Sequence, residues 1–146
     1  MRVALAIAQD ALASGDVPVG AVIVNKSGEI IATGHNEREL HQDSTAHAEI
    51  VAIRRATEIV GQWRLEDHML VVTLEPCAMC AGAITQSRIS TLVFGAWDEK
   101  AGAVGSVWDL LRDPRSLFKV EVRAGILAEE CSDRLKEFIQ GVRKKD

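Results

Sequence analysis

The spacing of apolar residues along the chain predicts five helices. In the first of them, Val3, Ile7 and Ala11 fall on one face. This helix covers residues 2–14 and ends at Gly15, a residue typical of helix ends. The other predicted helices cover residues 46–60, which Gly61 ends, residues 76–88 beginning at Pro76, a short stretch over 106–111, and residues 128–139.

Runs rich in β-branched and apolar residues predict five strands, over residues 21–24, 29–34, 69–74, 91–95 and 119–123. Turn residues 25–28 join the first two strands, which therefore form an antiparallel hairpin. The third strand is nearly all apolar, as expected of a central strand that is covered on both faces. The polar residues 35–44 and the segment 96–105 are predicted loops.

The order of these elements predicts the architecture. Helices separate the last three strands, so right-handed crossovers make those strands parallel. Joined to the hairpin, they give a three-layer α/β/α sandwich with a five-stranded mixed sheet. Residues 1–146 contain no internal repeat and no change of composition, so we expect a single domain.

The composition supports a globular protein with an aliphatic core. Hydrophobic residues make up 47% of the chain and charged residues 26%, whereas aromatic residues reach only 4%. The formal net charge of −4 gives no general attraction to nucleic acid. Any grip on RNA must therefore come from a local basic group such as Arg143, Lys144 and Lys145.

Cysteine usage and hydropathy predict the compartment. The chain has 3 cysteines, an odd number that does not fit a disulfide framework and suits a reducing environment. Gln9 and Asp10 interrupt the apolar start, which argues against a signal peptide. No apolar run reaches the roughly 20 residues needed to span a bilayer. We therefore expect a soluble, cytoplasmic protein.

Cys77 and Cys80 form a C-x-x-C motif where an apolar strand gives way to a predicted helix. Three residues apart on a helix, the two side chains share one face. Free N–H groups and the dipole at a helix start favour the thiolate form. Taken alone, the motif fits a metal site and a redox couple equally well.

His47 and Glu49 begin the other long predicted helix. One histidine and two cysteines make three zinc ligands and leave a fourth position for water, which is typical of a catalytic site. The spacing H-x-E followed by P-C-x-x-C is the signature of zinc-dependent deaminases that act on nucleobases. A closed structural site needs a fourth ligand, and none of the remaining candidates has finger-like spacing: His35, His41, His68 and Cys131.

The chemistry of such a site assigns a role to Glu49. Zinc lowers the pKa of water from about 15.7 to roughly 7, so hydroxide becomes available at neutral pH. Deamination also requires a group that moves the proton from water to the ring nitrogen and then to the leaving amine. Glu49 fits this role because it lies beside the metal without ligating it. Ala48 and Pro76, at the two helix starts, are predicted to contact the substrate.

Several longer segments carry a family resemblance. They are Val17–Val22, Asn36, Thr45–Ile50, Thr73–Ala83, Phe94–Asp98, Gly102–Ser106 and Gly125–Cys131. In these segments the chain resembles the bacterial tRNA-specific adenosine deaminases, which have the cytidine deaminase-like fold. The resemblance covers nearly the whole chain.

The resemblance implies a homodimer that converts adenosine to inosine at the wobble position of a tRNA anticodon stem-loop. It implies one Zn²⁺ per subunit on His47, Cys77 and Cys80, with Glu49 as the proton shuttle. It further implies that Asn36 contacts the flipped base and that Asp98 contacts the neighbouring nucleotide.

The sequence also departs from the family pattern. Trp97 stands where relatives often have arginine, so it is expected to stack on a base or to pack in an interface. Gly141 weakens the last helical turn by roughly 1 kcal/mol relative to alanine. Two alternatives stay open: a small-molecule deaminase acting on guanine, cytosine or a nucleoside, and a zinc module that binds a partner without catalysis. The loop at Gly95–Asp98 and the basic tail favour RNA over the small molecule.

Overall fold

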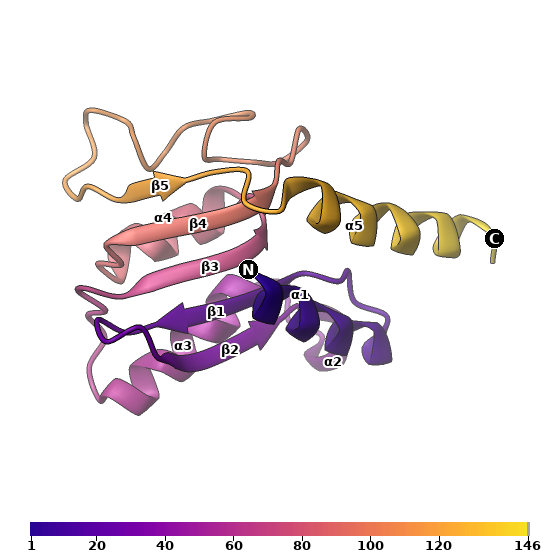
Figure 1. Ribbon diagram of the computed structural model, residues 1–146, viewed down its shortest axis with the longest axis horizontal. Coiled ribbons are helices and arrows are strands. Elements are labelled where there is room, and N and C mark those ends of the chain that lie inside the picture. The colour runs from indigo at the N-terminus through magenta and orange to yellow at the C-terminus, as the bar shows by residue number, and fades with distance from the viewer. Residues whose placement is uncertain (146) are drawn as a thin grey trace.

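The structure is a computed structural model and describes residues 1–145. Five strands form one mixed sheet in the order β2-β1-β3-β4-β5, as Figure 1 shows. Their bounds are β1 Gly20–Val24, β2 Ile30–His35, β3 Met69–Leu74, β4 Thr91–Ala96 and β5 Glu121–Arg123. Each strand lies within two residues of its predicted range.

The pairing of the strands confirms the predicted topology. β1 pairs antiparallel with β2 and with β3, whereas β3, β4 and β5 are parallel. The sheet is therefore mixed, as expected. Parallel strands end at the same edge of a sheet, so the segments that follow β3 and β4 leave it side by side. The C-x-x-C motif lies in the first of these segments.

Helices cover both faces of the sheet (Figure 1). The main helices are α1 Arg2–Ala8, which continues as the 3₁₀ helix η1 Gln9–Ser14, then α3 Ala48–Val60, α4 Ala78–Gln86 and α5 Ala128–Arg143. α3 and α4 pack on one face, and α1 packs on the other, where α5 joins it through an ion pair between Arg2 and Glu130. The three-layer α/β/α sandwich is thus confirmed.

Successive residues along the central strands point to opposite faces and fill two cores. Leu70, Val72 and Phe94 lie fully buried under α3 and α4. Val71 and Val93 face α1 on the other side of the sheet. The core is aliphatic, as the composition predicted. Within residues 1–145, no helix has the length and apolar character that a membrane span requires.

Three predictions in this part of the fold were wrong. The predicted loop 35–44 contains a short helix, α2 Arg38–His41, whose N–H groups at Glu39 and Leu40 donate to the Asp16 carboxylate. α4 begins at Ala78 rather than at Pro76, because Cys77 is extended and serves as its N-cap. α3 similarly begins two residues later than predicted, after His47.

The predicted helix over 106–111 does not form. This segment is a series of turns, held by an isolated bridge between Val104 and Asp109. The N–H groups of Val107, Trp108 and Leu110 donate to the carbonyl groups of Gly102 and Ala103, which precede the segment, instead of to carbonyl groups four residues back. The N–H of Ser106 donates to the Glu75 carboxylate. The last helix, α5, runs four residues further than predicted, to Arg143.

Candidate functional site

The predicted metal ligands lie at two helix starts on one edge of the sheet. His47 is the N-cap of α3 and Cys77 the N-cap of α4, and both have extended backbone conformations. Cys80 lies in the first turn of α4 and is fully buried. A helix start leaves N–H groups free and carries a partial positive charge, which favours anionic ligands such as thiolates.

The three side chains converge with the geometry that zinc requires. The Sγ atoms of Cys77 and Cys80 lie 3.6 and 3.4 Å from Nδ1 of His47. A tetrahedral zinc with bonds of about 2.3 Å to sulfur and 2.0 Å to nitrogen places such atoms about 3.5 Å apart. The set of one imidazole and two thiols also matches the donors that zinc prefers.

The structure excludes a fourth protein ligand among the candidates named from the sequence. Within residues 1–145, His47, Cys77 and Cys80 are the only group of three or more potential ligands that converges. His35 and His41 contact Glu37, and His68 contacts the backbone of Glu66. Among residues 1–145 no fourth protein ligand joins these three, so the geometry does not support a closed structural zinc site.

The charge state of the thiols suits a metal site. A hydrogen bond from Cys80, together with one from His47, lowers the pKa of Cys77 to about 3. The same pairing with Cys77, together with burial, raises the pKa of Cys80. The hydrogen bond to Cys77 also raises the pKa of His47. A bound zinc ion displaces protons from these groups, because only thiolate and neutral imidazole ligate.

Glu49 lies beside these ligands in the first turn of α3 and is 4% exposed. Burial raises the pKa of its carboxyl group to about 7, and the positive charge of His47 only partly opposes this shift. A group with this pKa both accepts and releases a proton at neutral pH. Its position and its pKa therefore suit the proton shuttle that the sequence predicted.

Asn36 connects the end of β2 to the start of α3. Its side-chain Nδ2 donates to the carbonyl group of Val17 at 3.0 Å, and its Oδ1 accepts from the N–H of Ala48 at 2.9 Å. The side chain thus fixes the first turn of α3 next to His47. The N–H of Ala48 is the donor expected to face the substrate, and in this structure it is bound to Asn36.

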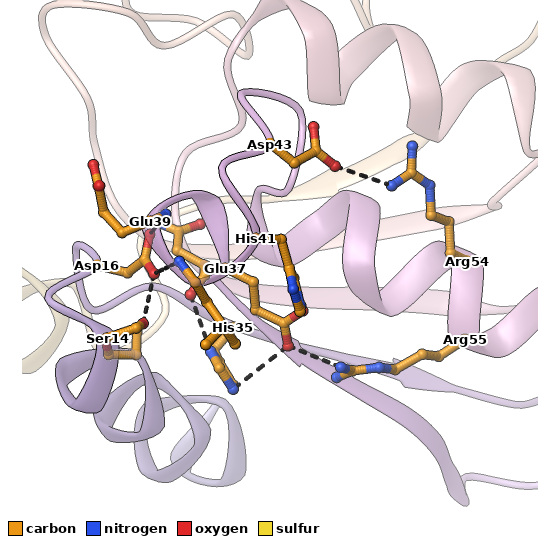
Figure 2. A network of polar contacts seen from close by, with 12 residues as sticks. Ser14, Asp16, His35, Glu37, Glu39, His41, Asp43, Arg54 and Arg55 are labelled. Carbon is orange, nitrogen blue, oxygen red and sulfur yellow. Dashed lines mark hydrogen bonds and ion pairs between the residues drawn. The ribbon is translucent and has the colours of Figure 1, made fainter.

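The residue that follows Asn36 is Glu37, a buried carboxylate. Figure 2 shows Glu37 between His35 of β2, His41 of α2 and Arg55 of α3. Its oxygens lie 2.8 Å from Arg55, 3.1 Å from His41 and 3.6 Å from His35. Glu37 is 5% exposed, so these partners compensate a charge that is nearly removed from water. The network thereby ties β2, α2 and α3 together around Asn36.

The chain is similar in sequence to known zinc-binding deaminases. Residues 1–96, two thirds of the chain, match the family model for the cytidine and deoxycytidylate deaminase zinc-binding region. The tRNA-specific adenosine deaminase of Bacillus subtilis is 48% identical over 145 residues, which cover 99% of this chain and 89% of that protein. The chain belongs to the tRNA-specific adenosine deaminase family.

Two solved structures are similar to the chain over most of its length. A structure from a study of A-to-I editing by tRNA:A34 deaminases at the wobble position of transfer RNA superposes with a TM-score of 0.88. It is 42% identical and covers 92% of this chain and 96% of its own. The guanine deaminase of Nitrosomonas europaea superposes with a TM-score of 0.78 at 27% identity, covering 94% of this chain and 81% of its own. The family match and the converging donors establish one zinc ion per subunit.

The other predicted substrate contacts lie around the metal centre without pointing to a common ligand. Pro76 is buried and has no N–H, and its carbonyl group accepts from Ala103 at 2.8 Å. Oδ1 of Asp98 accepts from the N–H groups of Lys100 and Ala101, which forms a tight turn. Trp97 packs edge-on against Phe94, with ring centroids 4.9 Å apart, and stays 48% exposed. The roles of Pro76 and Asp98 stay predictions.

The sequence reasoning assigned no role to Glu75, although it stands within the C-x-x-C motif region. It is 2% exposed and accepts hydrogen bonds from the loop that follows β4. The sequence did contain a signal for a structural role of Glu75. A carboxylate that directly follows an apolar central strand is expected to be buried, and a buried charge needs several partners.

Proposed function

We propose that this protein deaminates adenosine to inosine at the wobble position of tRNA anticodons, by zinc-dependent hydrolysis that releases ammonia. One observation carries the proposal: three zinc ligands and a buried carboxylate with a pKa of about 7 converge in a chain of the tRNA-specific adenosine deaminase family. In this proposal residues 1–146 act as one zinc-dependent deaminase domain, with His47, Cys77 and Cys80 as the metal ligands.

The residues of the chain divide the work between binding and proton transfer. When bound, Zn²⁺ acts as a Lewis acid that acidifies water at neutral pH. Glu49 accepts the proton of the attacking water and delivers it to the ring nitrogen. The same carboxylate then takes the remaining proton from the hydroxyl group added to the ring carbon and passes it to the exocyclic amine. The carbonyl group of inosine forms as the carbon–nitrogen bond breaks and ammonia leaves, so the atoms of water and adenosine are accounted for. Burial excludes bulk water from Glu49 and keeps its pKa in the range that this exchange needs.

The base and its neighbour contact the residues around the metal. We assign the flipped base to Asn36, helped by Ala48 and Pro76 at the two helix starts, and the neighbouring nucleotide to Asp98. Asn36 exchanges part of its present hydrogen bonding with Ala48 and Val17 for the base. Arg143, Lys144 and Lys145 at the exposed end of α5, which extends beyond the sheet in Figure 1, supply positive charge for the phosphate backbone.

The protein is proposed to act as a homodimer in the cytoplasm. Large apolar side chains at Met79, Val107 and Trp108 are 38%, 44% and 54% exposed, and association is a common reason for such exposure. All three cysteines are free, which suits a reducing compartment. Light scattering coupled to gel filtration measures the mass directly, and a monomer at micromolar concentration contradicts the dimer.

The decisive experiment measures inosine in anticodon stem-loops that carry a wobble adenosine. Zinc-loaded protein is expected to convert that adenosine, and a stem-loop with adenosine only at another anticodon position serves as the matched control. Guanine, cytosine, cytidine and free adenosine are tested in parallel. Turnover of one of these small molecules, with no inosine in the stem-loop, refutes the proposal.

The small-molecule alternative has one observation in its favour. The guanine deaminase of Nitrosomonas europaea shares the fold over 94% of this chain. Its identity of 27% is well below the 48% found for the Bacillus subtilis tRNA deaminase. The guanine arm of the same experiment separates the two substrates.

A further inference from the structure

We infer that Glu75 is a positioning residue that fixes the loop Trp97–Ser106 against the metal centre and thereby sets the affinity for the RNA substrate. The inference rests on the proposed function and adds a residue to it. Glu75 follows the last residue of β3 and stands two residues before Cys77. The side-chain oxygens of Glu75 form no hydrogen bond with a metal ligand. Among the predicted substrate contacts they reach only the backbone N–H of Asp98.

The carboxylate of Glu75 is surrounded by donors from one loop. It accepts hydrogen bonds from the N–H groups of Asp98 at 3.0 Å, Val104 at 3.0 Å and Ser106 at 3.1 Å. It also accepts from the hydroxyl group of Ser106. All these donors come from residues 98–106, so the single side chain gathers both ends of the loop.

The contacts of the loop leave little room for another arrangement. A Cβ atom built on Gly102 lies 2.3 Å from the carboxyl carbon of Glu75, so only glycine allows the backbone to approach this closely. Within residues 1–145, no lysine, arginine or histidine forms an ion pair with Glu75. The loop's own N–H and O–H groups therefore supply the stabilisation of this buried charge.

The loop is attached to the metal ligand on one side and presents the substrate contacts on the other. Gly102 forms a bridge with Cys77, and the N–H of Ala103 donates to the carbonyl group of Pro76 at 2.8 Å. Trp97 and Asp98 begin the same loop, and the N–H of Asp98 is itself a donor to Glu75. Releasing the carboxylate thus frees the substrate-facing residues while the three zinc ligands keep their helix starts.

The test replaces Glu75 by glutamine in the zinc-loaded full chain. Glu75→Gln keeps the shape, but its NH₂ group faces N–H donors where an oxygen stood. The Michaelis constant for the wobble-adenosine stem-loop is expected to rise about tenfold, with the turnover number changed less than threefold and zinc content unchanged. Ser106→Ala, which removes one donor, is expected to give a smaller change in the same direction.

Amide exchange measured by NMR provides a readout that does not depend on activity. The amides of Asp98, Val104 and Ser106 are expected to lose protection in Glu75→Gln, while amides in β1 and β3 keep theirs. Glu58→Gln, which alters an exposed carboxylate on α3, is the matched control and is expected to change neither readout. Gly102→Ala displaces the carboxylate from the opposite side and is expected to reproduce the effects of Glu75→Gln.

Two outcomes overturn the inference. In one, Glu75→Gln and Gly102→Ala keep the Michaelis constant and the loop protection of the unaltered protein. In the other, both variants lose zinc and protection throughout the sheet, which assigns Glu75 to the general fold. Inactivity of the unaltered protein on the stem-loop refutes the proposed function instead. The amide-exchange measurement then tests the role of Glu75 without any activity. Loss of amide protection confined to the loop supports the inference, and unchanged protection overturns it.

Discussion

Gly34 controls how closely the helix that carries His47 approaches the sheet. It lies in β2, and a Cβ atom built on it meets the carbonyl oxygen of Ala48 at 2.5 Å and the nitrogen of Ala52 at 2.7 Å. Ordinary van der Waals contacts begin at 3.4 Å, so in Gly34→Ala the new Cβ atom and the carbonyl oxygen of Ala48 have to move apart by about 0.9 Å. Both clashing atoms belong to the backbone of α3, so the whole first turn of the helix has to shift.

This shift is large compared with the tolerance of a metal site. Metal–ligand distances hold to within about 0.2 Å, and the two sulfur atoms now lie 3.4 and 3.6 Å from His47 Nδ1. We therefore expect Gly34→Ala to weaken zinc binding by about 10- to 100-fold, as happens when supports of metal ligands are removed. The overpacking itself is expected to lower the free energy of unfolding by about 1–3 kcal/mol.

Two other glycines provide controls. Gly20→Ala creates a clash of similar kind, 2.0 Å from the carbonyl oxygen of Ala4, but against α1 on the opposite face of the sheet. It is expected to destabilise the fold while zinc affinity stays within about twofold of the unaltered protein. Gly82 on α4 has no neighbour within 4 Å, so Gly82→Ala is expected to add about 0.5–1 kcal/mol of stability.

The assay combines thermal unfolding of the metal-free proteins with competition for zinc against a chelator of known affinity. A change of 1 kcal/mol shifts the melting temperature by about 2–4 °C in a chain of this size. The reasoning is refuted if Gly34→Ala and Gly20→Ala lower zinc affinity equally, because zinc binding then follows overall stability rather than the position of α3.

Three further outcomes follow from the metal centre. Glu49→Gln keeps the shape but cannot carry a proton, so inosine formation is expected to fall by about 10²–10⁴-fold with zinc content unchanged; residual activity within tenfold of normal contradicts the shuttle. Cys80→Ala removes a ligand, so metal analysis is expected to find no zinc and the zinc-dependent rise in melting temperature disappears; equal metal content contradicts this. Finally, the hydrogen bond to Cys77 raises the pKa of His47, and pairing with Cys77 raises that of Cys80, so zinc has to displace protons. Affinity is expected to rise with pH, about tenfold per unit for each proton released, and to be lost as pH falls; calorimetry in two buffers counts the protons.

The metal centre could be predicted from the sequence because its residues depend on local structure. Gly15 and Gly61 end helices with φ values of 77° and 79°, as their positions in the pattern indicated. His47 and Cys77 precede helices that periodicity alone locates to within two residues. A strand, a short turn and a helix start suffice to aim a ligand, so the H-x-E and P-C-x-x-C motifs carry most of the information.

The loops around the site could not be predicted because distant residues organise them. α2 depends on the Asp16 carboxylate, which accepts a hydrogen bond from the N–H group of Glu39, 23 residues further along the chain. The segment 106–111 has the apolar spacing of a helix, yet Ser106 at its start donates through its N–H and hydroxyl groups to Glu75, 31 residues earlier in the chain. Local propensity is a weak preference, and a buried carboxylate that needs donors overrides it.

Within residues 1–145, three of the four buried carboxylates hold segments that are distant from them in the sequence. Asp16, Glu37 and Glu75 are 3%, 5% and 2% exposed, and each accepts hydrogen bonds or ion pairs from a segment distant in the sequence. Leaving such a charge without partners is costly, so each carboxylate holds its loop in one arrangement. The zinc ligands lie instead at helix starts, where the local structure of their own motifs places them. We therefore expect a change at Glu75 to alter how the substrate is held and a change at a zinc ligand to remove the metal, so that zinc content separates the two classes of variant.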